Sequence, residues 1–259
     1  IYAQHGQNLF EDSSSFTGEW RIDEQLDALY EQDRVVPIVV AIENGGAKRI
    51  DEYSPWPGKY GGGEGHAYAR FVAEELVPMI DKNYMTQPDR DQRFLLGSSL
   101  GALINSYIQL KYPDFFSANL AFSPAYWYNP QIMQQIDSLE AGSNDILTYH
   151  IAGETEDSGG VALRIEEFED RMESALGESY SGVHLIHENG RHNEAYWSEQ
   201  FGAAWRISWS HIYARSISTP VQNGSESFIC EDENGAFRGR TINGLRSVVS
   251  CEEIAKLNH

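Results

Sequence analysis

The sequence predicts an α/β fold with a mainly parallel sheet flanked by helices. Short apolar, β-branched runs alternate along the chain with longer segments whose apolar residues recur at helical spacing, which is typical of this class. A chain of 259 residues is long enough for one such domain with a large core. We therefore expect a single α/β domain over residues 1–215 and a short C-terminal extension over residues 216–259.

The first half of the chain predicts two strands, two helices and one long loop. Residues 1–4 form a short apolar strand, and the continuous β-branched run 35–42 fits a parallel strand covered on both faces. Residues 19–30, between these two strands, place large apolar side chains at helical intervals. Residues 71–80, after the second strand, do the same. Residues 43–65 are rich in Gly, Pro and aromatics and predict a long loop, a feature that often belongs to a binding site.

The segment from Asp91 to Ile104 is the centre of the prediction. An apolar run ends in Gly97-Ser98-Ser99-Leu100-Gly101, and a helix-compatible segment opens with Ala102. This order predicts a buried strand, a sharp turn and a helix, with Ser99 in a strained conformation and two glycines that avoid collisions across the bend. The turn would expose the Ser99 hydroxyl at a helix N-terminus, where backbone N–H groups favour a developing oxyanion. We therefore expect Ser99 to be a nucleophile.

The second half repeats the alternation of strands and helices. The expected strands are 118–122, 146–152 and 183–186, and the expected helices are 161–176 and 195–213. Three consecutive aromatics, from Tyr126 to Tyr128, follow the strand 118–122. Because ligands of open α/β sheets bind beyond the carboxyl ends of the strands, we expect Tyr126 and Trp127 to line a pocket there. The alternative is that at least one of the three aromatics packs inward. Trp56 and Arg49, in the long loop, are further candidates for substrate contact.

Composition restricts the partners. The formal charge of −20, from 19 basic and 39 acidic residues, argues against nucleic acid or an anionic membrane surface. No run of 18 apolar residues is present, so we expect no membrane span. The chain also lacks metal-ligand spacings, phosphate-cradling loops and a dinucleotide fingerprint, and we expect neither a metal nor a cofactor. The oligomeric state is left open.

Cys230 and Cys251 are the two cysteines, and both lie in the extension. They bracket a segment rich in Gly and Asn, which indicates a disulfide and therefore a secreted or periplasmic protein. Two unpaired cysteines in a cytoplasmic protein are the alternative. No signal peptide is visible, but the chain opens within an expected strand, which leaves room for a leader and earlier strands before Ile1.

A serine hydroxyl needs a general base, and the base needs an orienting carboxylate. Acidic residues follow the strand 146–152, and histidines follow the strand 183–186. The serine, an acid and a histidine therefore each follow a strand, in the chain order that is typical of α/β-hydrolases. Among the acids we favour Glu156, with Asp157 as the alternative. His192 is the expected base because it lies in a Gly-containing loop just before a helix. His184 and His187, on or at the end of the strand, are expected to be structural.

Together these residues resemble the putative esterase family of α/β-hydrolases, over about residues 1–213. The family includes esterase D-like proteins, siderophore esterases, and feruloyl and acetyl esterases of carbohydrates. The motifs that carry the resemblance are His5-Gly6-Gln7-Asn8-Leu9-Phe10, Arg49 with Glu52-Tyr53, Glu75-Leu76-Val77-Pro78-Met79-Ile80-Asp81, Gly97-Ser98-Ser99-Leu100-Gly101, Tyr112-Pro113-Asp114-Phe115-Phe116, Ser123-Pro124, Gly153-x-x-Glu156, and Gly190-x-His192-Asn193 with Trp197. The family usually has Gly where this chain has Ala102, and the extension has no counterpart in it.

The resemblance implies a serine esterase of the α/β-hydrolase fold. It assigns Ser99 as nucleophile, His192 as general base and Glu156 as acid, with an oxyanion hole formed by the backbone N–H groups of Leu100 and Gln7. The expected substrate is a small or medium carboxylic ester, such as a carbohydrate-linked acyl ester. A siderophore trilactone is the alternative substrate. A non-catalytic binding module on the same scaffold and acyl transfer to an alcohol are the alternative functions.

Overall fold

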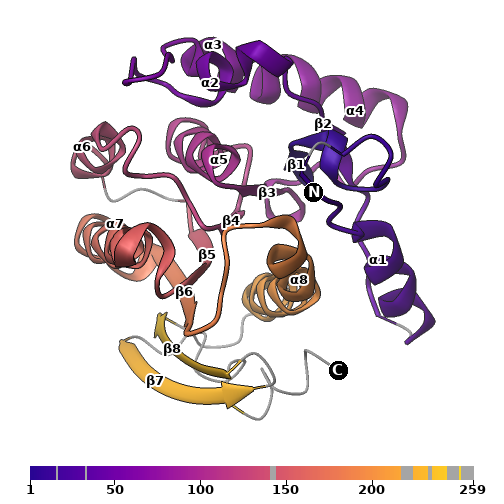
Figure 1. Ribbon diagram of the computed structural model, residues 1–259. Helices are drawn as coiled ribbons and strands as arrows, with labels where there is room; N and C mark the ends of the chain where they lie inside the picture. The colour runs from indigo at the N-terminus through magenta and orange to yellow at the C-terminus, as the bar shows by residue number, and fades with distance from the viewer. Residues whose placement is uncertain are drawn as a thin grey trace.

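One mostly parallel sheet forms the centre of the molecule. A computed structural model describes residues 1–15, 17–32, 34–140, 144–216, 224–232, 235–243 and 251. Within these residues, eight strands lie in the order β2-β1-β3-β4-β5-β6-β8-β7 (Figure 1). Strands β1 to β6 pair in parallel, and β8 pairs antiparallel with both β6 and β7. The predicted α/β class is therefore confirmed.

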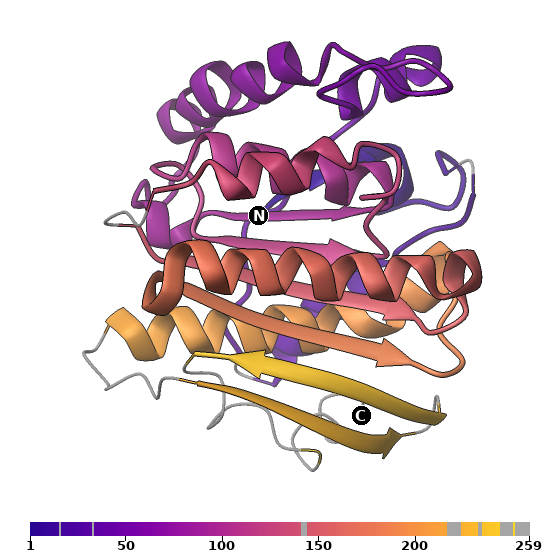
Figure 2. The same ribbon diagram turned by 90° about the vertical axis from the view of Figure 1, so that its left-hand side faces the viewer.

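The central strands are buried along their whole length, as expected for parallel strands covered on both faces, although β4, β5 and β6 also carry buried polar residues such as Asn119, His150 and His184. Every residue of β3, β4, β5 and β6 is buried. The bounds of the strands are β1 (Tyr2–Gln4), β2 (Val40–Ile42), β3 (Phe94–Ser98), β4 (Ala118–Phe122), β5 (Ile146–Gly153), β6 (Tyr180–His187), β7 (Ser225–Asp232) and β8 (Gly235–Ile242). Figure 2 shows β3, β4, β5 and β6 ending on the same side of the sheet.

Helices cover both faces of the sheet. Their bounds are α1 (Ile22–Glu31), α2 (Arg49–Tyr53), α3 (Gly65–Arg70), α4 (Val77–Asn83), α5 (Leu100–Lys111), α6 (Gln131–Asp137), α7 (Gly160–Leu176) and α8 (Glu194–Ser216). A π-helical stretch, Phe71–Leu76, joins α3 to α4. Helices α5 and α7 lie on one face of the sheet, and α1 and α8 lie on the other (Figure 1).

Two apolar clusters fill the space between the sheet and its helices. On the face of α5 and α7, side chains such as Leu103, Ile132 and Phe168 belong to one cluster. On the other face, Trp20 and Phe201 belong to a second cluster with residues of β3, β4 and β5. Burial of apolar surface on both faces fixes the strands, and so it also fixes the loops at their carboxyl ends.

The structure differs from the sequence predictions at the N-terminal edge of the sheet. The expected strand 35–42 is limited to β2, because its parallel partner β1 pairs with it over only three residues. Because β2 is an edge strand, Val35 and Ile38 are more than half exposed instead of covered. The expected loop 43–65 contains the short helix α2, which begins at Arg49.

The described part of the C-terminal extension joins the main sheet. The hairpin of β7 and β8 continues the sheet beyond β6, and Arg238 and Arg240 of β8 form ion pairs with acidic residues of α7. A disulfide joins Cys230 to Cys251. Helix α8 ends at Ser216, the first residue of the predicted extension, and residues 217–223, 233–234, 244–250 and 252–259 fall outside the described residues. In the part of the chain that the structure describes, no helix has the length and apolar character needed to cross a membrane.

Candidate active site

The turn between β3 and α5 has the geometry that the sequence predicts. Ser99 has φ 53° and ψ −123°, a conformation that is rare for a residue with a side chain. The backbone around it is well fixed, because the Ser99 N–H donates to the Phe122 carbonyl at 2.9 Å and the Ala125 N–H donates to the Ser99 carbonyl at 3.1 Å. The turn therefore holds Ser99 at the N-terminus of α5, beyond the carboxyl end of β3.

Close packing explains the two glycines that flank this turn. A Cβ on Gly97 would lie 2.7 Å from the backbone of Gly101, and a Cβ on Gly101 would lie 3.0 Å from the ring of His5. Both distances are shorter than van der Waals contact allows without movement. The two residues lack side chains because the strand, the helix and His5 meet here.

Glu156 and His192 form a hydrogen-bonded pair. Nδ1 of His192 lies 2.8 Å from Oε2 of Glu156, and the carboxylate is almost fully buried while the imidazole is 41% exposed. Oε1 of Glu156 accepts a hydrogen bond from the Gly153 N–H at 2.6 Å and another from the Ser123 hydroxyl at 2.9 Å. An ionised carboxylate only accepts hydrogen bonds, so Nδ1 of His192 carries the proton in this pair and Nε2 is left as an acceptor. The neighbouring acid, Asp157, is exposed.

Two loops meet to form this pair. The acid follows β5 and the histidine follows β6, and a Cβ on Gly153 would lie only 2.1 Å from the carbonyl oxygen of Gly190. After His192, Asn193 caps α8 by accepting the Tyr196 N–H at its Oδ1, 3.0 Å away. The crossing glycines and the capped helix thus limit the positions that the imidazole can take.

A cavity of about 780 Å³ lies against Ser99 and His192. Its wall contains mostly polar side chains and one indole. The lining residues are His5, Gln7, Asn8, Ser14, Thr17, Asn44, Gly46, Arg49, Ser98, Ser99, His192, Asn193, Glu194 and Trp197. Of the predicted site residues, the structure therefore brings Ser99, His192, Gln7 and Arg49 to one cavity. Glu156 lies behind the wall and contacts His192.

His5 and Arg49 form a polar contact in this wall. Nε of Arg49 donates to Nε2 of His5 at 2.7 Å. Burial, together with the charge of Arg49, lowers the pKa of His5 to about 3, so the imidazole stays neutral and can accept this hydrogen bond. The contact fixes the Arg49 side chain by its Nε and leaves its other nitrogens available to the cavity.

Leu100 and Gln7, the two residues expected to donate backbone N–H groups, lie close to Ser99. Leu100 follows Ser99 in the chain, and Gln7 lines the same cavity. Leu100 is the first residue of α5, and N–H groups in the first turn of a helix have no partner within the helix. Gln7 lies in the 3₁₀ turn Gly6–Asn8 after β1. The amide of Gln7 is bonded to Asn44, and the Gln7 carbonyl accepts the Ser14 hydroxyl at 2.9 Å. These contacts hold the turn against the cavity.

The aromatic residues predicted to contact substrate lie elsewhere. Tyr126 is fully buried, with its ring stacked on Phe168 at 4.8 Å, because the chain turns inward after β4. Trp127 is about half exposed but does not line the cavity. Trp56 packs against Tyr107 at 5.6 Å and is also absent from the wall. These positions argue against a substrate contact by any of the three.

Sequence reasoning missed several residues of the site. Ser123 donates to Glu156, and Trp197 packs its ring edge-on against His192 at 5.1 Å. Elsewhere in the cavity wall, Oε1 of Glu194 accepts hydrogen bonds from Thr17 at 2.6 Å and from Asn8 at 3.2 Å. Two signals were available: Ser123 directly follows a buried strand, where side chains at that end of the sheet gather, and both Ser123 and Trp197 belong to the motifs that carry the family resemblance.

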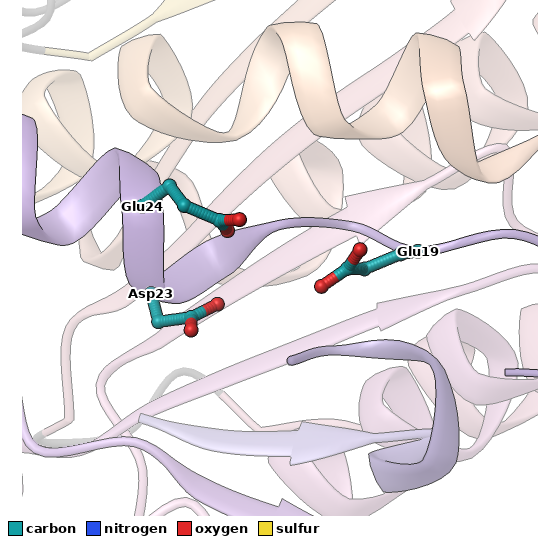
Figure 3. A group of neighbouring side chains, drawn as sticks. All are labelled: Glu19, Asp23 and Glu24. Atoms are coloured by element: carbon teal, nitrogen blue, oxygen red, sulfur yellow. The ribbon is translucent and has the colours of Figure 1, made fainter. Parts of the chain in front are cut away.

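A group of three carboxylates lies outside the cavity wall. The carboxylate oxygens of Glu19, Asp23 and Glu24, near the start of α1, lie within 4.8 Å of one another (Figure 3). Asp23 and Glu24 are exposed, and Glu19 is half-buried. Exposed acidic groups often gather in this way without an ion, and we assign no metal to them.

Comparison with a library of protein families gives one match that spans most of the chain. The model of a family described as "Putative esterase" matches residues 1–206. The matched residues include the turn at Ser99, the pair of Glu156 and His192, and the whole wall of the cavity. The β7–β8 hairpin lies beyond the match.

Individual proteins agree with this result. The chain is 26% identical over 231 residues to the uncharacterized protein YbbA of Bacillus subtilis, covering 85% of this chain and 87% of that protein. It is 31% identical over 140 residues to the ferri-bacillibactin esterase BesA of the same organism, covering 52% of this chain and 44% of that protein. The crystal structure of the BES protein from Bacillus cereus has a similar fold, with a TM-score of 0.61, 18% identity, and coverage of 80% of this chain and 81% of that chain. These findings support an ester hydrolase and do not specify its substrate.

Proposed function

Because the chain belongs to the putative esterase family, we propose that it is a serine carboxylesterase that works through an acyl-enzyme. The observation that carries the proposal is that Ser99 and His192 line one cavity while Glu156 bonds the imidazole from behind its wall. Ser99 occupies the sharp turn, His192 lies in the same wall, and Glu156 bonds the far nitrogen of that imidazole. A serine hydroxyl needs a histidine base and an orienting carboxylate to act as a nucleophile at neutral pH, and these positions support that role for His192 and Glu156.

In the proposed reaction, Oγ of Ser99 attacks the carbonyl carbon of the ester while Nε2 of His192 takes the hydroxyl proton. Glu156 holds Nδ1–H and stabilises the imidazolium that forms. The tetrahedral intermediate carries its negative charge on the former carbonyl oxygen. The N–H groups of Leu100 and Gln7 stabilise that oxygen, and the dipole of α5 adds to the effect.

The intermediate collapses when His192 returns its proton to the leaving alcohol, and the acyl group stays on Ser99. A water molecule then attacks the acyl-enzyme, with His192 again accepting a proton, and the acid product leaves. The reaction needs only the ester, water, the three side chains and the backbone N–H groups that hold the oxyanion. Acyl transfer to a second alcohol would use the same residues, and product analysis with sugar acceptors would distinguish it from hydrolysis.

We propose a polar alcohol portion for the substrate, such as a carbohydrate that carries an acyl ester. The cavity has a volume within the range of small-molecule sites, and most of its lining residues carry amide, hydroxyl or charged groups that could bond a polar group, while apolar atoms make up the larger part of its exposed surface. Arg49 could pair with an anionic group of the substrate. A siderophore trilactone is the second candidate, favoured by the similarity to BesA, although the charge of −20 would repel an anionic iron complex at long range.

The experiment that tests the proposal is the hydrolysis of p-nitrophenyl acetate by the wild-type protein and by Ser99→Ala. We expect activity in the wild type and its loss in the variant with an unchanged circular dichroism spectrum. Equal activity in both proteins would rule the mechanism out, and an inactive wild type that no fluorophosphonate labels would favour a binding module. A panel of acetyl, feruloyl and trilactone esters would then identify the substrate class.

We also propose that the protein works in an oxidising compartment, that is, a secreted or periplasmic location. The disulfide between Cys230 and Cys251 supports this proposal, because such bonds are rare in reducing cytosol.

A further inference from the structure

We propose that Ser123 is a positioning residue that fixes the orientation of the Glu156 carboxylate and, through it, of His192. The inference rests on the proposed function and adds to it a residue outside the triad. Ser123 does not line the cavity, so its role would be to hold the acid without touching the substrate.

The backbone of Ser123 is the first observation. Ser123 directly follows β4, is fully buried and has φ 45°, in the left-handed region that residues with side chains rarely adopt. Its N–H donates to the Ile151 carbonyl at 2.7 Å, which holds it between β4 and β5. Such a conformation costs free energy and persists where the surrounding contacts enforce it, often at functional sites.

The direction of the Ser123 proton is the second observation. Nε1 of Trp197 donates to Oγ of Ser123 at 2.9 Å, and an indole can only donate. The hydroxyl is therefore the acceptor in that bond, and its own proton is directed to Oε1 of Glu156, also at 2.9 Å. Two fixed contacts thus determine how the hydroxyl is oriented.

This hydrogen bond determines which carboxylate oxygen faces the base. Oε1 of Glu156 accepts from both Ser123 and the Gly153 N–H, so Oε2 is the oxygen left for Nδ1 of His192. The Trp197 ring also packs against the imidazole, with an interplanar angle of 75°. Trp197 therefore contacts the proposed base through its ring and the proposed acid through Ser123.

The same segment also holds the proposed nucleophile. Phe122, directly before Ser123, accepts the Ser99 N–H, and Ala125 donates to the Ser99 carbonyl. The four residues 122–125 therefore contact the nucleophile through the backbone and the acid through one hydroxyl. We infer that this short segment sets the relative positions of the three proposed catalytic groups.

The test compares Ser123→Ala with Ser117→Ala. Ser117 is a matched control, because it is also fully buried, also donates through its hydroxyl, and lies at the opposite end of β4. We expect Ser123→Ala to lower kcat about tenfold with an unchanged KM, since a charge-assisted hydrogen bond to the acid is lost without a change in the cavity wall. We also expect the downfield NMR proton of His192 Nδ1–H to shift or broaden. Ser117→Ala should change neither quantity.

A second variant keeps the test decisive if Ser123→Ala does not fold. Trp197→Phe retains an aromatic ring beside His192 but removes the N–H that orients Ser123, and we expect it to move the same NMR proton. In the double variant the losses of kcat should not add, because both substitutions break one chain of hydrogen bonds.

Two results separate this inference from the proposed function. Wild-type values of kcat and of the NMR proton in a folded Ser123→Ala variant of an active enzyme would overturn the positioning role. An inactive wild type, in contrast, would contradict the proposed function, while a change of the NMR proton in Ser123→Ala would still support the positioning of Glu156 and His192.

Discussion

Replacement of Glu156 by Gln tests the proposed acid with little change of shape. The carboxylate accepts three hydrogen bonds, two at Oε1 from Gly153 and Ser123 and one at Oε2 from His192. A glutamine side chain has one carbonyl oxygen and one NH₂ group. Because the Oε1 position faces two donors, we expect the amide oxygen to occupy it and the NH₂ group to face His192.

The expected effect on catalysis follows from this orientation. An NH₂ group beside Nδ1 needs an acceptor, so the imidazole of His192 would take the tautomer with its proton on Nε2. That tautomer cannot accept the proton of Ser99. In other serine hydrolases the equivalent exchange lowers kcat by about 10⁴-fold, and we expect a loss of about 10³- to 10⁴-fold in Glu156→Gln, or about 4–5 kcal/mol of transition-state stabilisation. KM should stay the same, because Glu156 does not line the cavity.

The assay is steady-state hydrolysis of p-nitrophenyl acetate by Glu156→Gln, with Asp157→Asn as the control. Asp157 is the adjacent acid in sequence, but it is exposed, and it should be replaceable with less than a twofold effect. Activity of Glu156→Gln within threefold of the wild type would refute the reasoning, as would a large loss in Asp157→Asn alone.

Three further predictions concern stability. The buried carboxylate of Glu169 is hydrogen-bonded to Nδ1 of His150 at 2.9 Å and to Nδ1 of His184 at 2.6 Å. In urea titrations, Glu169→Ala should lower the free energy of unfolding by about 3–5 kcal/mol. A loss below about 1 kcal/mol would contradict this prediction. Burial raises the pKa of Glu169, but the two imidazoles outweigh this effect and lower the pKa from 4.5 to about 2. The ionised carboxylate therefore stabilises the folded state fully above about pH 4.5. This stabilisation, of about 3 kcal/mol, should be lost as the pH falls to about 2. Cys230 and Cys251 are 21 residues apart in the chain. Reduction of their disulfide should lower the free energy of unfolding by about 3 kcal/mol. Unfolding with and without a thiol reductant measures this difference, and equal stabilities would contradict the prediction.

The fold, and the positions of the polar candidate site residues at the ends of strands, were predictable because they depend on the local pattern of apolar and polar residues. The strands β3 to β6 are rich in apolar residues and alternate with helices, and in a parallel sheet the loops that follow such strands lie at the same end. Ser99, Glu156 and His192 each follow one of these strands. The expectation that these three residues lie at one end of the sheet therefore required no knowledge of side-chain packing.

The aromatic residues were not predictable for the opposite reason. From sequence, Tyr126 and Trp127 are two adjacent aromatics after a strand, and nothing in their spacing shows which one points inward. The positive φ of Ser123 turns the chain so that Tyr126 enters the core, where Ser106 bonds its hydroxyl. The strained backbone of one residue thus determines which neighbouring side chain is buried. The periodicity of the sequence gives no information on such strain.

The edges of the sheet were also missed. β2 is shorter than its β-branched sequence predicts, because pairing with β1 limits it. The β7–β8 hairpin was not predicted at all, because its residues show neither a continuous apolar run nor a strict alternation. Edge strands depend on their one neighbour more than on their own composition.

The central claim is that the hydroxyl of Ser99, and of no other serine in the cavity, is the group that becomes acylated. The most direct measurement is mass spectrometry of the peptide that spans Ser98 and Ser99 after treatment of the folded protein with a fluorophosphonate. We predict one adduct per chain, on Ser99, and no adduct after denaturation or in His192→Ala. An adduct on Ser98, or a folded wild-type protein without any adduct, would contradict the claim.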